Sequence, residues 1–213
     1  MRALRTYVTA VTAAALLAGS GTAMAAPTPG SGPAGRPAAS PTAVSRFDDG
    51  SFETPAVEPH AFRTVSAGQS IGPWKVTGGT VDLIGTGYWQ AAEGDQSVDL
   101  NGMEPGAVAQ TFATTPGTSY TVTYSLSGNP QLGHVPAVKT GKVLIDGQNV
   151  QDFSFDVSGT TEAEMGYVRR QLTFVARGTS MTLGFASTTA HSATGPVVDD
   201  VTVERCRTSC CTC

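Results

Sequence analysis

The sequence predicts an all-β fold, a two-sheet antiparallel β-sandwich of the jelly-roll type. Short segments alternate apolar and polar residues, which is typical of a strand with one face in a core and one in water. Pairs of turn-forming residues separate these segments. Within residues 46–205 no segment keeps apolar residues at helical spacing for three turns. An immunoglobulin-like sandwich is the alternative, although no Cys pair is available to bridge its sheets.

The first 25 residues have the features of a secretory signal peptide. Arg2 and Arg5 supply a positive start, an apolar run covers residues 7–17, and Ala23-Met24-Ala25 offers small residues for cleavage. The run is too short to span a bilayer. We therefore expect a secreted, extracellular protein that is associated with the cell surface if its C-terminal tail attaches it there.

Residues 26–45 are predicted to be a disordered spacer. They are mostly Pro, Ala, Gly, Ser and Thr, with Arg36 as the one charged residue, so they cannot bury enough apolar surface to offset the entropy of ordering. The segment 46–205 has the size of one ordinary domain. Residues 206–213 form a separate Cys-rich tail.

The alternation is clearest at residues 120–126, where Tyr, Val, Tyr and Leu alternate with Thr, Thr and Ser. The same pattern predicts further strands at 153–157, 172–176, 181–185 and 201–203. Asp146-Gly147 follows an apolar run, and this dipeptide tolerates the positive φ angles of a two-residue hairpin loop. Trp74, which follows Ile71-Gly72-Pro73, is assigned to the core.

The charge of the chain is acidic. The net charge is −4, and without Arg2 and Arg5 of the signal, 11 basic residues stand against 17 acidic ones, a net charge of −6. No basic cluster is larger than Arg169-Arg170. Such a chain has no electrostatic footprint for nucleic acid or anionic lipid.

Catalytic motifs are absent from the sequence, which favours a non-enzymatic protein. His60, His134 and His191 lie in loop-like sequence without a nucleophile elbow. No zinc-ligand spacing, phosphate loop or dinucleotide fingerprint occurs. A glycoside hydrolase stays open as an alternative, because its paired carboxylates are defined by distance in space. The candidates for such a pair are Asp82, Glu93, Asp95 and Asp99.

An aromatic and polar stretch is the best candidate for ligand binding. Sugar rings stack their C–H faces on aromatic rings, and amides and carboxylates bond their hydroxyls. The predicted carbohydrate-binding residues are Tyr88, Trp89, Gln90, Glu93 and Asp95. The alternative for Trp89 is that it fills the core at a corner of a sheet.

Acidic residues near both ends of the domain could converge. If the first and last strands lie side by side, Asp48, Glu53, Asp199 and Asp200 come together. Oxygen ligands of this kind suit a hard cation, so we expect a structural Ca²⁺ ion. The alternative is that these carboxylates sit at a solvated rim.

All four cysteines lie in the tail, at positions 206, 210, 211 and 213. In an exported protein, Cys206, Cys210, Cys211 and Cys213 allow three intramolecular disulfide pairings, a thiolate metal site, or cross-linking to another molecule.

Several motifs resemble those of known families. Their order resembles that of the bacterial choice-of-anchor C proteins, and the domain is similar to the plant cell-wall family called domain of unknown function 642. The motifs are Ser51-Phe52-Glu53, residues 72–76, residues 79–84, residues 88–94, residues 97–102 and Gly195-Pro196-Val197-Val198-Asp199-Asp200-Val201.

The resemblance implies a galactose-binding-like jelly roll that is exported, is associated with the cell wall and has no assigned catalytic activity. It also implies a calcium ion between an early Glu and a late Asp, here Glu53 and Asp199 or Asp200. We therefore expect a non-catalytic module that binds a cell-wall polysaccharide or wall protein. A surface adhesion protein tethered through its tail is the alternative.

Overall fold

The computed structural model describes residues 46–131 and 136–206, and these form a two-sheet antiparallel β-sandwich. The predicted signal peptide, the predicted spacer, and Cys210, Cys211 and Cys213 lie outside the described residues. The fold class predicted from the alternation is confirmed. Among the described residues, there is no helix of the length and hydropathy needed to cross a membrane.

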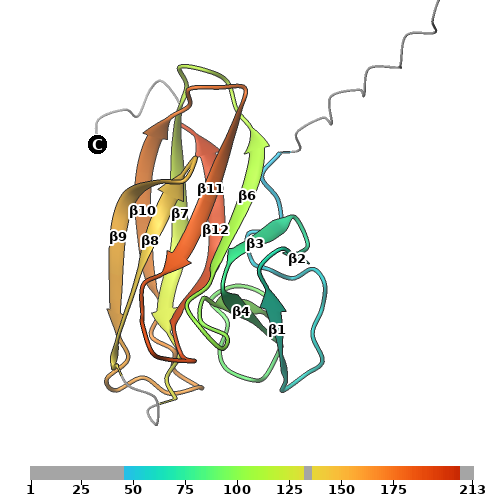
Figure 1. The fold of residues 1–213 in the computed structure, drawn as a ribbon, viewed down its shortest axis with the longest axis vertical. Helices are drawn as coiled ribbons and strands as arrows, with labels where there is room; N and C mark the ends of the chain where they lie inside the picture. Colours follow the sequence, from blue (N-terminus) through green and yellow to red (C-terminus); the bar gives the residue numbers. More distant parts are fainter. Residues whose placement is uncertain (1–45, 132–135, 207–213) are drawn as a thin grey trace, which may run out of the picture. The chain divides into compact units, whose positions relative to one another are not determined.

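Each sheet has six strands. The first sheet, sheet A, has the order β1-β4-β5-β12-β7-β10, and sheet B has the order β2-β3-β6-β11-β8-β9. Strands β1 to β4 gather at one side of the sandwich, beside the longer strands (Figure 1). The strands are β1 (Phe62–Ser66), β2 (Ser70–Ile71), β3 (Trp74–Gly78), β4 (Thr80–Ile84), β5 (Ser97–Asp99), β6 (Ala107–Ala113), β7 (Ser119–Gly128), β8 (Val138–Ile145), β9 (Gln148–Asp156), β10 (Val168–Val175), β11 (Ser180–Ser187) and β12 (Pro196–Arg205).

The alternating segments of the sequence lie in strands as predicted, except that Val157 and Ala176 fall one residue past the ends of β9 and β10. In β7, the even-numbered residues from Tyr120 to Leu126 face the core between the sheets. Strands β8 and β9 pair with Ile145 opposite Gln148, and Asp146 and Gly147 between them both have positive φ. This is the hairpin that the Asp-Gly pair predicted.

Trp74 is in the core, as predicted. Its side chain is fully buried, and its ring packs against those of Phe47, Phe52 and Phe185 at centroid distances of 5.6, 4.9 and 6.2 Å. Its indole N–H donates to the carbonyl oxygen of Asp49 (2.8 Å). This contact fixes the segment that precedes β1 against the core.

The segment around residue 50 lies beside β12, the last strand. The predicted meeting of acidic residues from both ends of the domain depends on this arrangement. The amide of Val201 donates to the carbonyl oxygen of Gly50 (3.0 Å). Strand β12 has an irregularity between Asp199 and Thr202, and Asp200 there has a φ of 49°. This irregularity sets the directions of the two neighbouring carboxylates.

Candidate functional site on the outer face of sheet A

The outer face of sheet A is partly covered by loops. In β4, Val81 and Leu83 belong to the main core, whereas Ile84 belongs to a second hydrophobic cluster. This second cluster also contains Trp89, Met165 and Val197, with Tyr88 and Tyr167 packed against it. Residues of two loops therefore cover strands β4, β5 and β12 on the side away from the core.

Next to this cluster lies an open cavity of about 260 Å³. It is lined by side chains from β1, β4 and the loops that follow β4, β5, β7 and β11. These include Phe62, Thr64, Asp82, Tyr88, Trp89, Met103, Asn129, Gln131 and Thr194. The cavity combines exposed apolar groups with hydrogen-bonding groups, which is the usual make-up of a small-molecule site.

The apolar wall of the cavity is made by Phe62, Tyr88 and Met103. Phe62 is 48% exposed and Met103 is 80% exposed. The ring of Tyr88 meets that of Phe62 edge to face at 5.5 Å, and Gln131 Nε2 donates to the Tyr88 hydroxyl (3.1 Å). Edge-to-face contact and a hydrogen bond fix the Tyr88 ring and leave the exposed Phe62 beside it.

The polar wall begins with Asp82. Thr64 Oγ1, on the neighbouring strand β1, donates to Asp82 Oδ1 (2.6 Å). Burial raises the pKa of Asp82, and the bond from Thr64 opposes this. Asp82 thus offers a partly buried acceptor at the cavity wall.

Asp99 lies opposite Asp82 on strand β5 and is fully buried. It accepts hydrogen bonds from Asn129 Nδ2 (2.8 Å), the Asn101 amide (2.8 Å) and the Gly195 amide (3.0 Å). Burial raises the pKa of Asp99 to about 7, against these three N–H donors, which lower it. Asp99 does not line the cavity itself. Its hydrogen bond with Asn129 positions a residue that does line the cavity.

Two of the five predicted sugar-binding residues line the cavity, namely Tyr88 and Trp89. Trp89 is only 5% exposed, and its indole N–H donates to Ser97 Oγ (2.9 Å). Most of its ring therefore packs in the second cluster, as the core alternative predicted. Gln90 Oε1 accepts from the amide of Met165 (3.1 Å), which ties together the two loops that cover sheet A.

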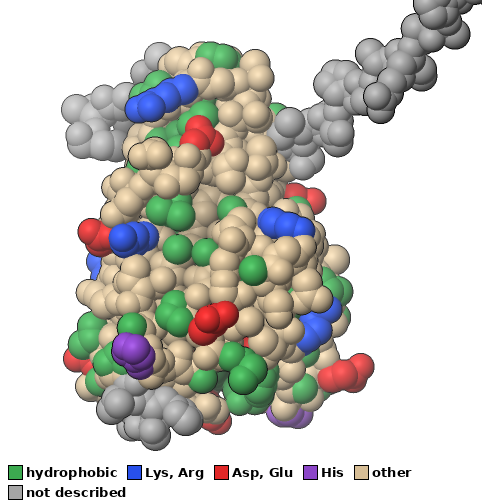
Figure 2. Space-filling view, in the orientation of Figure 1, with side chains coloured by type: hydrophobic (Ala, Val, Ile, Leu, Met, Phe, Trp, Pro, Cys, Tyr) green, Lys and Arg blue, Asp and Glu red, His purple; other side chains and the backbone are tan. Residues whose placement is uncertain are grey.

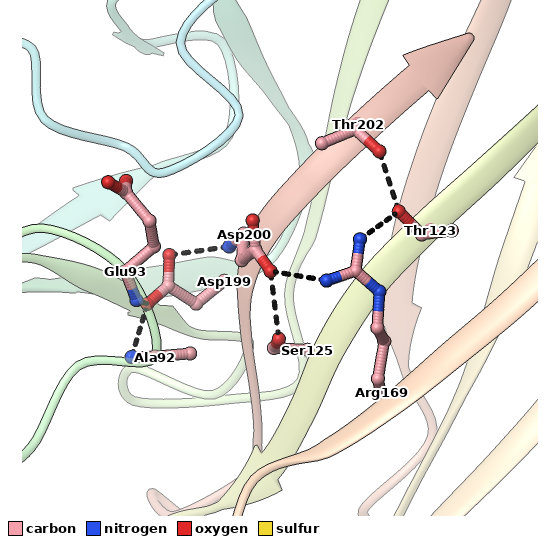
Figure 3. A network of polar contacts seen from close by, with 8 residues as sticks. All are labelled: Ala92, Glu93, Thr123, Ser125, Arg169, Asp199, Asp200 and Thr202. Carbon is pink, nitrogen blue, oxygen red and sulfur yellow. Dashed lines mark hydrogen bonds and ion pairs between the residues drawn. The ribbon is translucent and has the colours of Figure 1, made fainter.

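Glu93 and Asp95 do not line the cavity. They belong to the loop of residues 92–96, whose backbone amides donate hydrogen bonds to the carboxylates of Glu53 and Asp199. Glu53 Oε1 accepts from the amides of Asp95 and Gln96, both at 2.9 Å. Asp199 Oδ2 accepts from the amides of Ala92 (2.7 Å) and Glu93 (3.1 Å) (Figure 3).

Glu53 and Asp199 thus converge on one loop. Burial raises the pKa of Asp199 to about 7, although three backbone N–H groups lower it. Asp200 points away from Asp199 (Figure 3) and forms an ion pair with Arg169 at 3.5 Å. Asp48 Oδ1 accepts from the amide of Asp49 (2.9 Å). In residues 46–131 and 136–206, no three or more His, Cys, Asp or Glu side chains are grouped to hold a metal ion.

The carboxylates considered for a glycoside hydrolase do not form a pair across the cavity. Asp82 lines the cavity, Asp99 is buried behind it, and Glu93 and Asp95 lie on the loop held by Glu53 and Asp199. The hydrolase alternative required two of these carboxylates facing each other across a cleft. Among the cavity's lining residues, only Asp82 belongs to that set.

Phe62, Thr64, Met103, Asn129 and Gln131 were not predicted from the sequence. They come from separate segments that meet only when β1 pairs with β4 and the loops fold over sheet A. The sequence signal that could have found them is the pairing of two strand-like segments, β1 and β4, which places Thr64 beside Asp82.

Basic side chains lie apart from one another on the face shown in Figure 2, so the described part of that face has no positive patch.

Two solved structures are similar in fold. TmCBM61 in complex with β-1,4-galactotriose is 17% identical, covers 76% of this chain and 98% of its own, and has a TM-score of 0.44. A family 35 carbohydrate binding module from Clostridium thermocellum is 14% identical, covers 67% of this chain and 97% of its own, and also has a TM-score of 0.44.

The sequence is also related to a much longer protein and to a family. Halomucin from Haloquadratum walsbyi is 30% identical over 141 residues, which is 65% of this chain but only 1% of Halomucin's length. The family described as Protein of unknown function (DUF642) matches residues 45–204, nearly the whole described sandwich. The chain therefore belongs to the DUF642 family.

Proposed function

We propose that this protein is an exported, non-catalytic module that binds carbohydrate in the cavity on the outer face of sheet A. The observation that carries the proposal is the pairing of Phe62 and Tyr88 with the polar groups of Asp82 and Gln131 in one open cavity. Aromatic rings offer a surface for the C–H face of a sugar. The carboxylate and the amide are suited to its hydroxyls.

Export and association with the cell envelope are part of the proposal. They are supported by the signal-like first 25 residues and by the resemblance to choice-of-anchor C proteins. The family assignment, which carries no function of its own, is compatible with this. N-terminal sequencing of the protein recovered from the medium or the wall fraction is the test, and a chain that keeps Met1 and stays in the cell would contradict export.

Substitutions in the cavity test the binding site. We expect Phe62→Ala and Tyr88→Ala each to weaken binding to a responsive oligosaccharide by about tenfold or more, because a central aromatic contact is typically worth 2 kcal/mol or more. Asp82→Asn keeps the size of the side chain and should weaken binding through the lost charge-assisted hydrogen bonds. Binding is measured by calorimetry after a screen of neutral and acidic wall polysaccharides.

The matched control for Phe62→Ala is Val150→Ala. Val150 is equally exposed, at 48%, but lines a different cavity with Phe174 and Met181. The control variant should bind like the natural protein. Unchanged binding by Phe62→Ala, Tyr88→Ala and Asp82→Asn together would remove this cavity as the site.

Calcium stays a proposal for the loop at residues 92–96, with Glu53 and Asp199 as the residues that would hold it. They fit the ion in part. Ca²⁺ takes six to eight oxygen ligands, whereas only these two of the four predicted carboxylates converge, and both already accept N–H bonds. Glu53 Oε2 has no hydrogen-bond partner among the described residues, so it is the oxygen available to a cation.

A chelator tests the calcium proposal. An ion that binds only the folded protein raises the unfolding midpoint by mass action. We expect EDTA to lower the midpoint, added Ca²⁺ to restore it, and Glu53→Gln to be insensitive to both. If EDTA leaves the unfolding midpoint of the natural protein unchanged, the calcium proposal is wrong. Glu53 and Asp199 would then stabilise the loop only by accepting hydrogen bonds from its amides.

A further inference from the structure

A second cavity adjoins the proposed sugar site. It has a volume of about 440 Å³ and is lined by the turn after β5 and the segment after β11. Among its lining residues are Glu104, His191 and Ser192. Met103 and Ala193 line both cavities, so the two hollows share a wall.

Both walls of the second cavity are held by hydrogen bonds. On one side, Thr80 Oγ1 accepts from the amides of Met103 (2.7 Å) and Glu104 (3.2 Å). On the other, buried Asn101 donates through Nδ2 to the carbonyl oxygens of Thr189 (2.9 Å) and Ser192 (2.8 Å). Walls fixed in this way reduce the entropic cost of binding, because little has to be ordered.

The shared wall carries the most exposed of the large hydrophobic side chains in the described residues. Met103 is 80% exposed although its own amide is bonded to Thr80. An exposed apolar side chain at the junction of the two cavities can contact a ligand that passes from one to the other. Met103 belongs to neither of the two hydrophobic clusters, so packing in a core does not account for its position.

Acidic side chains line both cavities, and behind the first one the buried Lys139 donates through Nζ to Thr194 Oγ1 (2.7 Å). Asp82 lines the first, Glu104 lines the second, and neither has a Lys or Arg among its lining residues. Two carboxylates along one path repel a ligand that carries a carboxylate on every sugar. A neutral chain of hydroxyl-bearing rings meets no such repulsion, and its hydroxyls can donate to both carboxylates.

The first cavity alone is slightly smaller than the roughly 300–1,000 Å³ usual for ligand sites, whereas the two joined fall within that range. We propose that they are consecutive subsites of one groove, which binds a neutral polysaccharide along its chain and discriminates against polyuronates. This inference rests on the proposed carbohydrate-binding function. It specifies that the ligand is a neutral chain long enough to reach both cavities. It also assigns Met103, Glu104 and His191 to ligand binding.

The test is the dependence of affinity on chain length and charge. The probes are cello-oligosaccharides and β-1,4-galacto-oligosaccharides of two to six sugars, and hexagalacturonate, all measured by calorimetry. We expect affinity for the neutral series that binds to rise by about tenfold or more from two sugars to six, since tenfold requires only about 1.4 kcal/mol from the second subsite. Hexagalacturonate should bind at least tenfold more weakly than the neutral hexamer.

Substitutions separate the two subsites. Glu104→Ala and His191→Ala should remove most of the gain with length and leave the affinity for the dimer unchanged. Tyr88→Ala should weaken dimer and hexamer alike. The exposed Glu164→Ala, which lies outside both cavities, is the control and should change neither affinity.

The outcomes distinguish this inference from the function on which it rests. If Tyr88→Ala weakens binding while length, Glu104 and His191 have no effect, the second subsite is wrong and the carbohydrate site stands. Equal or tighter binding of hexagalacturonate overturns the charge discrimination. If no probe binds, or if Tyr88→Ala has no effect on the probe that does, the proposed site itself is overturned.

Discussion

Trp74→Ala is expected to destabilise the domain by about 3–5 kcal/mol, the range for removing a large aromatic side chain from a packed core. Trp74 is fully buried among three aromatic rings, and its indole N–H bonds to the Asp49 carbonyl oxygen. The alanine variant would leave a cavity, and the Asp49 carbonyl oxygen would keep only its longer bond from the Phe52 amide (3.3 Å). For a domain of this size, the unfolding midpoint should fall by roughly 10 °C, since 1 kcal/mol corresponds to about 2–4 °C.

Two further variants make the Trp74 result specific. Trp74→Phe keeps an aromatic ring and should lower the free energy of unfolding by less than Trp74→Ala does. It loses only part of the ring volume and the hydrogen bond to Asp49. Phe62→Ala removes a half-exposed aromatic and should change stability by less than about 1 kcal/mol while weakening sugar binding. Urea unfolding measures all three, and equal losses from Trp74→Ala and Phe62→Ala would contradict the assignment of core and site.

The free energy of unfolding is expected to fall as the pH rises from about 4 to about 7. Burial raises the pKa of both Asp99 and Asp199 to about 7 in the folded protein, from 3.8 as the ordinary value. Between these values the folded state binds more protons than the unfolded state, so each added pH unit removes stability. The stability that these protons supply is complete below pH 4 and is lost above pH 7.

The upper bound of this pH effect is roughly 9 kcal/mol, because one pKa unit corresponds to about 1.4 kcal/mol and the pKa of each of the two carboxylates rises from 3.8 to about 7. Urea unfolding at pH 4.5, 6 and 8 in the presence of EDTA measures it, because a bound cation would hold Asp199 in its charged form. Asp99→Asn and Asp199→Asn should each flatten the profile, since an amide does not titrate in this window. A natural protein whose stability rises with pH between 4.5 and 7 would contradict the raised pKa values.

The sequence predicted strands where alternation is regular and a turn signal is local. The hairpin of β8 and β9 is an example, because Asp146 and Gly147 suffice to specify its loop. Strand β5 was less visible. All three of its residues, Ser97 to Asp99, are buried, because loops cover the face that would otherwise be solvated. A strand buried on both faces carries no alternation to detect.

The candidate site was predictable only in part. Tyr88 lies in the aromatic and polar stretch that suggested sugar binding, and it lines the cavity. Phe62, Met103 and Gln131 reach the same cavity through strand pairing and long loops, which local sequence does not reveal. The acidic residues show the same limit. Glu53 and Asp199 accept from amides of the same loop, whereas the irregular backbone of β12 turns Asp200 towards Arg169.

The most direct test of the carbohydrate site is to map amide chemical shifts of the isotope-labelled domain during titration with an oligosaccharide that binds. The proposed function predicts that the largest changes occur at Phe62, Thr64, Tyr88, Met103 and Gln131. Large changes confined to the outer face of sheet B, on strands β6 and β11, would contradict it.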